Sequence, residues 1–271
     1  MYKGFIVDDF DENSDFQNKF FEVWESSSSQ ENKFLANKDF NIFLKDFIIR
    51  DSVNRDLILD GAKLAEHYFP SVQADIFISH SHKDVKKAKA FAKYIYIKTG
   101  LVSFIDSEVW SFAEDLLRCL DNEYCYNSGS MLYSYEKRNI STSYVHMMLN
   151  TALLNMIDKC ECLFFLSTPN SFNTEKEIKN TTFSPWIYSE LSMANVIRKK
   201  KPRRYQRKKL LIEQSVTQFS QEDLKIAFPL KTENLIKCKA SQIQYWLSGC
   251  KSTKKIENLD KLYEMLDSPR E

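Results

Sequence analysis

Glycine is scarce in this sequence, and no two glycines lie near each other. The 271 residues contain five, namely Gly4, Gly61, Gly100, Gly129 and Gly249. Dinucleotide fingerprints and phosphate-binding loops need clustered glycines, because backbone amides must approach the phosphates closely. If the chain binds a nucleotide, it therefore uses neither device.

Long apolar runs and an excess of one charge are also absent. No run approaches the roughly 18 residues that a membrane-spanning helix needs, and the first residues lack the basic and apolar segments of a secretory signal. The 38 basic and 37 acidic residues nearly cancel, so the whole chain has no strong attraction to nucleic acid or to a membrane. These features predict a cytoplasmic protein without a membrane partner.

The cysteines do not have the spacing of a zinc site. Paired Cys-x-x-Cys spacings supported by histidines are missing. We therefore expect no bound metal, and thiols that are reduced and buried. The six cysteines are Cys119, Cys125, Cys160, Cys162, Cys238 and Cys250.

The sequence does contain a short apolar run followed by a polar turn. Residues 75–84 read DIFISHSHKD, and an apolar run too short for a helix predicts a strand buried on both faces. Ligands of open α/β sheets bind beyond the carboxyl ends of the strands, which makes Ser79, His80 and Ser81 candidate site residues. A plain polar turn with a helix cap fits the same letters.

Strands and helices are predicted to alternate after this point, which favours an α/β fold with a doubly wound, mainly parallel sheet. Further strands are expected at 101–106, 162–167 and 210–212. Helices are expected at 84–100, 112–120, 144–157, 184–194, 242–247 and 256–266. The polar, tyrosine-rich stretch 122–143 has no clear period and is predicted to be an irregular insertion.

The first 72 residues are predicted to be an N-terminal helical extension outside the sheet, and residues 73–271 the α/β domain. Helices are expected at 16–24 and 34–44, and a third is expected to start at Ser52 and end at Pro70. This region contains no group of catalytic residues. We therefore expect it to pack on the domain or to mediate assembly.

A second polar feature lies in the segment SPWIYSELSMA. Ser184 and Pro185 are the favoured N-cap and first residue of a helix. Trp186 and Glu190 are four residues apart and therefore share one face of that helix. A carboxylate held beside an indole at the mouth of a crevice stabilises a developing cation. An ordinary surface glutamate beside a core tryptophan fits the spacing equally.

Four motifs in order, DIFISHSHKD, FIDSEVW, CLFFLSTPNS and SPWIYSEL, resemble the Toll/interleukin-1 receptor (TIR) domain, particularly its bacterial stand-alone and antiphage forms. The match covers roughly residues 73–266. The resemblance implies a flavodoxin-like sheet and an enzyme that cleaves the nicotinamide–ribose bond of NAD. NAD is then the substrate, and no other cofactor is implied.

The resemblance also implies roles for single residues. The W-x-x-x-E pattern of the family matches Trp186 and Glu190, with Glu190 as the catalytic residue. The strand exit that lines the nucleotide site matches residues 77–81, which adds Phe77 to the substrate-binding candidates. The BB loop of the family matches the stretch from Asp106 to Trp110, with a loop expected over 107–110. His146 is a further candidate for the pocket, and an ordinary helix histidine is its alternative.

The reaction that the resemblance implies needs stabilisation of positive charge at the anomeric carbon, because nicotinamide on ribose is already a cationic leaving group. Carboxylates meet the same demand in glycosidases. With water as acceptor the product is ADP-ribose, and with the adenosine half of NAD it is a cyclic isomer. The outcome is either a signal to a separate effector, as in Thoeris-like defence systems, or depletion of NAD.

Two other functions remain open at this point. The resemblance implies that the enzyme forms a homo-oligomer through TIR interfaces. A non-enzymatic TIR adaptor, acting only through interfaces, needs no glutamate at position 190. Nine of the twelve residues 198–209 are Lys or Arg, and clustered cations neutralise phosphates of nucleic acid. A solvated helix-to-strand connection explains these cations as well, so a nucleic-acid partner is not expected.

Overall fold

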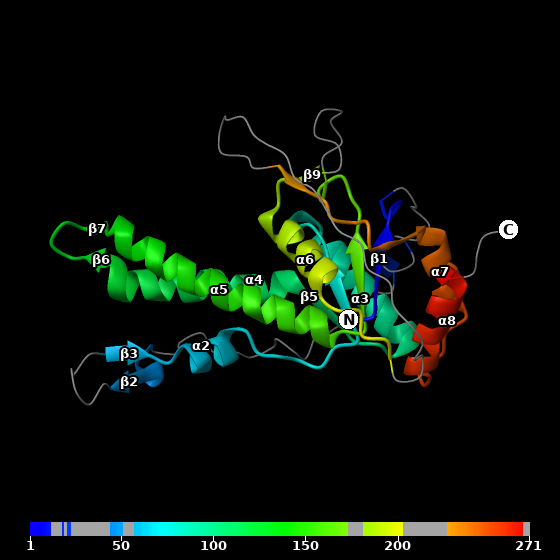
Figure 1. The fold of residues 1–271 in the computed structure, drawn as a ribbon, viewed down its shortest axis with the longest axis horizontal. Coiled ribbons are helices and arrows are strands. Elements are labelled where there is room, and N and C mark those ends of the chain that lie inside the picture. The colour runs from blue at the N-terminus through cyan, green and yellow to red at the C-terminus, as the bar shows by residue number, and fades with distance from the viewer. Residues whose placement is uncertain are drawn as a thin grey trace. The chain divides into compact units, whose positions relative to one another are not determined.

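The computed structural model describes residues 1–11, 18, 21–22, 44–50, 57–172, 181–202 and 227–267. The chain has two compact units (Figure 1). The first comprises Met1–Ser27, Ala74–Phe104 and Ile157–Glu271, and the second comprises Ser28–Gln73 and Ile105–Met156.

A five-stranded parallel sheet forms the core of the first unit, which confirms the predicted α/β class. In spatial order its strands are β11 (Ile236–Cys238), β1 (Lys3–Val7), β8 (Cys162–Leu166), β4 (Ile76–Ser79) and β5 (Ser103–Ile105). The register aligns the first residues of β1 and β4 with the first residue of β8. Every residue of β8 and β4 is buried, as expected for parallel strands covered on both faces.

The N-terminal strand β1 shows that one prediction is wrong. Residues 1–72 were expected to lie outside the sheet, yet β1 lies between β8 and β11. Phe5 and Val7 of this strand have no exposed surface. The run GFIV has the apolar character of the other buried strands, but its partners are more than 150 positions away. Short-range periodicity carries no information about such a pairing.

The strand order agrees with a doubly wound sheet in three positions. A flavodoxin-like sheet has the order 2-1-3-4-5. Here β5, β4 and β8 take the first three positions, whereas β1 takes the fourth and β11 the fifth. The chain leaves β4 and β8 in opposite directions along the sheet, so the topological switch point lies between these two strands. Ligands of such sheets bind at this point, beyond the carboxyl ends of the strands.

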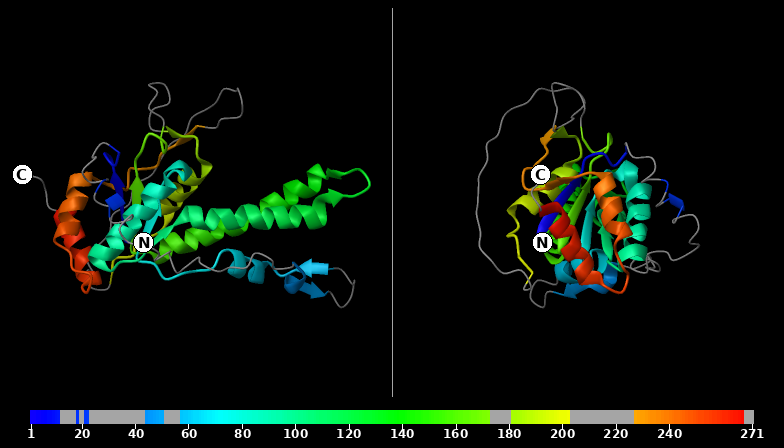
Figure 2. Two further views of the ribbon diagram at one scale, coloured as in Figure 1. Left: turned by 180° about the vertical axis from the view of Figure 1, so that it is seen from behind. Right: turned by 90° about the vertical axis from the view of Figure 1, so that its right-hand side faces the viewer.

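Helices cover both faces of the sheet, and all those predicted within the described part of the first unit are present. Helix α3 (Val85–Thr99) follows β4, and α6 (Pro185–Val196) follows β8 on the opposite side (Figure 2). Helix α3 ends at Gly100, whose φ of 72° is the left-handed conformation that favours glycine at this position. Helices α7 (Ala240–Ser248) and α8 (Lys255–Asp267) complete the unit.

The second unit contains two long antiparallel helices joined by a hairpin (Figure 1). Helix α4 (Asp106–Leu120) continues as one π-helical turn, Asp121–Cys125. The hairpin strands β6 (Tyr126–Asn127) and β7 (Leu132–Tyr133) follow, and α5 (Tyr135–Lys159) returns. The stretch 122–143 is therefore not irregular, and residues 107–110 form helix rather than loop. Both predictions were wrong.

A buried carboxylate connects the end of α4 to the beginning of α5. Asp121, at the end of α4, accepts hydrogen bonds from the Ser141 hydroxyl at 2.6 Å and from Arg138 Nε at 2.8 Å. The Cys125 thiol lies 3.8 Å from the same hydroxyl. These contacts connect α4 to the first turns of α5 and fix the position of the hairpin between them.

The remaining described part of the second unit contains a short 3-10 helix (Leu44–Phe47), a hairpin and one α-helix. Strands β2 (Ile48–Arg50) and β3 (Leu57–Leu59) pair antiparallel. Helix α2 (Gly61–Tyr68) follows, capped by Asp60, whose carboxylate accepts from the amides of Ala62 and Lys63. The helix predicted from Ser52 is thus strand at 57–59 and helix only after Asp60. The elements predicted at 16–24, 34–44 and 210–212 lie mainly or wholly outside the described residues.

Candidate active site

Helix α6 begins where the sequence predicts. The Ser184 hydroxyl accepts a hydrogen bond from the Ile187 amide at 3.3 Å, and Pro185 occupies the first helical position. A side-chain cap and a fixed φ together define where the helix starts. As predicted, Ile187 and Leu191 are buried. Glu190 lies beside them on the same helix.

Glu190 and Ser79 form a buried pair. The Ser79 hydroxyl donates a hydrogen bond to Glu190 Oε2 over 2.7 Å, and both residues have 0% of their surface exposed. Ser79 is the last residue of β4, so the carboxylate lies at the carboxyl end of this strand. The structure thus brings together two predicted site residues that are 111 positions apart in the sequence.

The burial of Glu190 is greater than the sequence predicts. We expected it at the margin of the buried stripe, facing a partly dry pocket, and instead it is completely enclosed. Burying a carboxylate away from water is costly unless hydrogen-bond donors replace the water. Ser79 supplies one such donor. A ligand that touches Glu190 must first displace side chains that cover it.

Trp186 lies one turn before Glu190 and is half-buried, so the predicted pair shares one face of α6. The ring of Tyr188 stacks on that of Phe228, with centroids 4.6 Å apart. Phe228 belongs to β10 (Phe228–Pro229), which pairs with β9 (Thr181–Thr182). This contact attaches α6 to the segment that follows it in the unit.

The other predicted residues of the β4 exit differ in position. The ring of Phe77 lies 5.4 Å from that of Phe104 and has no exposed surface, so Phe77 belongs to the core. His80 is 3% exposed, and its Nδ1 lies 3.4 Å from the carbonyl oxygen of Ile78. Ser81 is also buried and directly follows His80. Ser79, His80 and Ser81 are therefore buried at the carboxyl end of β4.

Asp84 connects the exits of β4 and β8. Its carboxylate accepts hydrogen bonds from Thr168 Oγ1 at 2.7 Å and from Asn170 Nδ2 at 3.0 Å. Asp84 occupies the predicted N-cap position of α3, but its side chain makes no hydrogen bond to the helix amides. It holds the turn after β8, which the sequence placed at Thr168, against the turn after β4.

Lys87 extends this network to the exit of β1. Its ammonium lies 2.7 and 2.8 Å from the two carboxylate oxygens of Asp11, and 3.2 Å from Asp84 Oδ1. Burial lowers the pKa of Lys87, but hydrogen bonds to the two carboxylates outweigh it and leave the pKa raised. The cation thus stays charged between them. Sequence analysis missed Asp11, because a contact over 76 positions leaves no local pattern.

Three predicted site residues belong to the second unit. Asp106 is the first residue of α4 and is half-buried. Trp110 lies in the second turn of the same helix, and its side chain lies outside the described part of the structure. His146 is exposed on α5.

Part of the basic run 198–209 has partners within the protein. Lys199 donates to the carbonyl oxygen of Ala194 near the end of α6, and burial lowers the pKa of its ammonium. Lys200 forms an ion pair with Asp158. Residues 203–209 lie outside the described range. Lys199 and Lys200 therefore have structural roles within the protein.

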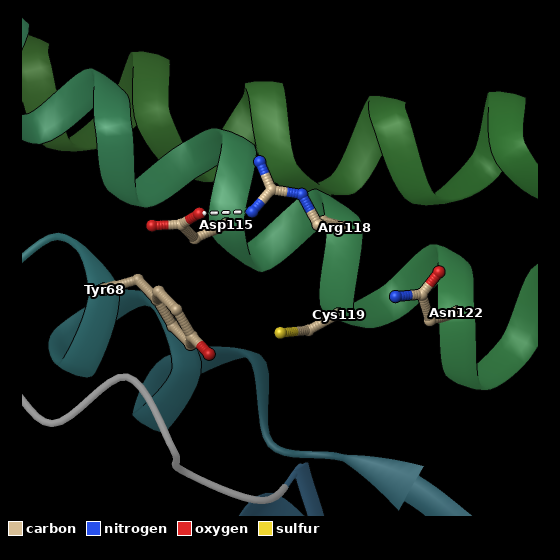
Figure 3. Close-up of a pocket in the computed structure, with 5 residues that line it drawn as sticks. All are labelled: Tyr68, Asp115, Arg118, Cys119 and Asn122. Carbon is tan, nitrogen blue, oxygen red and sulfur yellow. Dashed lines mark hydrogen bonds and ion pairs between the residues drawn. The ribbon is translucent and has the colours of Figure 1, made fainter.

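A pocket of about 230 Å³ lies in the second unit between α2 and α4 (Figure 3). An ion pair of 3.0 Å joins two of its residues, Arg118 and Asp115. Burial, with smaller effects of Cys119 and Asp115, raises the pKa of Tyr68. The pocket is lined by Tyr68, Asp115, Arg118, Cys119 and Asn122. None of them was predicted as a site residue.

The described residues offer neither a metal-binding cluster nor a membrane-spanning helix. They contain no group of three or more His, Cys, Asp or Glu side chains arranged to hold a metal ion. Within the same residues, every helix is too short or too polar to cross a membrane.

Comparison of the chain with protein-family models, with curated proteins and with solved structures finds no match.

Proposed function

We propose that this protein is a TIR-type enzyme that cleaves the nicotinamide–ribose bond of NAD, with Glu190 as the catalytic residue. One observation carries the proposal. The carboxylate of the W-x-x-x-E pattern is held by Ser79 at the carboxyl end of β4, beside the topological switch point of the sheet. This is where ligands bind in doubly wound sheets, and both residues come from motifs that resemble the TIR family.

The proposed chemistry uses the negative charge of Glu190. The bond between ribose C1′ and the nicotinamide nitrogen breaks, and its electron pair leaves with nicotinamide, which becomes neutral. Positive charge then builds up on C1′ and the ring oxygen, and the carboxylate stabilises it. Ser79 orients the carboxylate, and Trp186 forms a wall beside the nicotinamide or ribose. A water oxygen attacks C1′ and loses a proton, which gives ADP-ribose.

Enclosure of Glu190 adds a step to this proposal. Because the carboxylate has no exposed surface, the substrate must open the site before C1′ can approach it. Closure around the bound substrate would then exclude water other than the attacking molecule, and would strengthen the charge interaction. The cyclic product follows if the adenine of the same NAD molecule occupies the acceptor position instead of water.

The role that we propose in the cell is antiphage defence. An enzyme of this type either lowers the NAD concentration or makes an ADP-ribose signal for a separate effector protein. The sequence motifs resemble the bacterial antiphage forms of the TIR domain. The site geometry fits both products, because both arise from the same cleavage step.

A non-enzymatic interaction module is the second candidate. The enclosure of Glu190 favours it, because an adaptor needs no carboxylate that a ligand can reach. In that case the Ser79–Glu190 pair is only a buried contact that fixes α6 on the sheet. The two candidates differ in whether the protein turns over NAD.

The discriminating experiment is incubation of the full chain with NAD, with nicotinamide and nucleotide products identified by mass spectrometry. The enzyme predicts nicotinamide with an equal amount of ADP-ribose or its cyclic isomer. For substitution of Glu190 by glutamine the matched control is Glu233→Gln, because Glu233 is an exposed glutamate of the same unit. NAD that stays intact with a correctly folded protein, in the presence of lysate from phage-infected cells, supports the adaptor instead.

A further inference from the structure

Helix α5 is apolar on two sides. One stripe is buried inside the second unit, and its residues Val145, Leu149 and Leu153 are at most 2% exposed. A second stripe faces solvent, and we call it the α5 stripe. Its large members are Ile140, Tyr144, Met147 and Leu154, which are 54%, 65%, 64% and 40% exposed, and Thr151 lies among them. A solvent-facing helix surface is normally charged or polar.

The sequence of this helix also lacks the charges that solubilise an exposed face. Between Arg138 and Asp158 there is no Asp, Glu, Lys or Arg, although 28% of the whole chain is charged. Helix α3 shows the usual pattern, because Lys86, Lys89 and Lys98 lie at positions that are exposed or half-buried. Protein interfaces are depleted of charge in their centres and enriched in Tyr and Met. The α5 stripe has this composition.

The spacing of the stripe identifies the kind of partner. Successive members are 4, 3, 4 and 3 residues apart, which is the repeat by which two helices pack along a common seam. The stripe is also complementary to itself. In an antiparallel pair centred on Met147, the large Tyr144 faces the small Thr151 of the second copy, and Ile140 faces Leu154. Met147 then lies against its own counterpart, as a two-fold interface requires.

The available area suits such a pair. The four large side chains of the α5 stripe each expose on the order of 100 Å², which gives roughly 400 Å² of apolar surface. A stable interface buries about 800 Å² per partner, and a little over half of such an area is apolar. The net charge of +1 causes little repulsion between copies.

From these observations we infer that the α5 stripe is the interface of a homodimer, in which α5 packs against α5 of a second copy with Met147 at the two-fold axis. This inference does not depend on NAD cleavage. The uncharged seam, its self-complementary spacing and its exposed area carry it together.

Sedimentation velocity of the full chain over a concentration series tests the inference. The wild type is expected to dimerise below about 10 μM. Met147→Glu and Met147→Lys each place like charges against each other at the axis, so the dissociation constant of each variant should rise at least about tenfold. An equimolar mixture of the two should regain the dimer, because opposite charges then meet. Tyr245→Lys is the matched control, since Tyr245 is 74% exposed on α7, and it should dimerise like the wild type.

Several outcomes would overturn the homodimer. These are a wild type that stays monomeric at about 100 μM, Met147 variants that dimerise as tightly as the wild type, and a mixture that gains nothing over its components. Circular dichroism of the variants distinguishes a lost interface from a lost fold. Met147 is largely exposed, so its substitution should leave the spectrum unchanged.

Discussion

At the scale of single residues, buried acidic groups are held by donors from distant parts of the chain. Glu190 accepts a hydrogen bond from the Ser79 hydroxyl, and Asp84 accepts hydrogen bonds from Thr168 and Asn170. Sequence patterns identified Glu190 and the Ser79 motif, because each lies in a recognisable local setting. They could not reveal that the two side chains bond, since the contact depends on the packing of α6 against the sheet.

The buried cysteines provide a test at this scale. Burial raises the pKa of Cys160 and Cys238 to about 12. Because only the thiolate is reactive, alkylation of these two thiols at pH 8 should be about a thousandfold slower than in the unfolded chain. Their rates should keep rising as the pH increases past 9 toward 12. Peptide mass spectrometry after timed exposure to iodoacetamide measures each site.

The half-buried Cys119 is the internal comparison for this experiment, because it lines the pocket of Figure 3. It should be labelled first in the folded protein. Labelling of Cys160 or Cys238 as fast as Cys119 at pH 8 would mean that the sheet opens readily, in disagreement with the packing described above.

At the scale of elements, the sequence predicted best where one apolar face dominates. The strands at 76–79 and 162–166 and helix α6 were located correctly, because short apolar runs and a Ser-Pro cap are strong local signals. Prediction failed over 122–143, where α5 begins. A helix with two apolar stripes lacks the single amphipathic face on which such predictions depend.

The contact that joins α4 to α5 gives a prediction for the second unit. Asp121→Ala removes a buried acceptor of two hydrogen bonds, so it should lower the free energy of unfolding by about 2–3 kcal/mol. Asp115→Ala is the control on the same helix, because Asp115 forms its ion pair with the exposed Arg118. Surface pairs of this kind contribute at most about 1 kcal/mol. Urea titration of both variants gives the comparison, and equal losses would show that the buried pair has no special role.

At the scale of the whole molecule, the N-terminal strand β1 forms part of the central sheet. The β5-β4-β8 half follows the doubly wound order, and the N-terminal strand fills the fourth position. The sequence predicted the fold class, but not this strand. Strand β1 pairs with β8, which lies more than 150 residues later in the chain. This pairing depends on long-range packing, which local propensity does not encode.

Deletion of residues 1–11 tests the position of β1. The deletion exposes one edge of β8 and separates β11 from the sheet. It also removes Asp11, the partner of Lys87. The shortened chain should fail to fold, and should give an insoluble product or a circular dichroism spectrum without cooperative melting. A truncated protein that is soluble and melts cooperatively would show that the first residues are an appendage after all.

The central claim is that the Glu190 carboxylate acts on NAD. The most direct test is the rate of nicotinamide release by the wild type, by Glu190→Gln and by Ser79→Ala, each verified as folded. Glutamine keeps the size of the side chain and one acceptor oxygen but not the charge, so the rate should fall at least about a hundredfold. Ser79→Ala should fall less, since it removes only the group that orients the carboxylate. Release by Glu190→Gln at the wild-type rate would contradict the account.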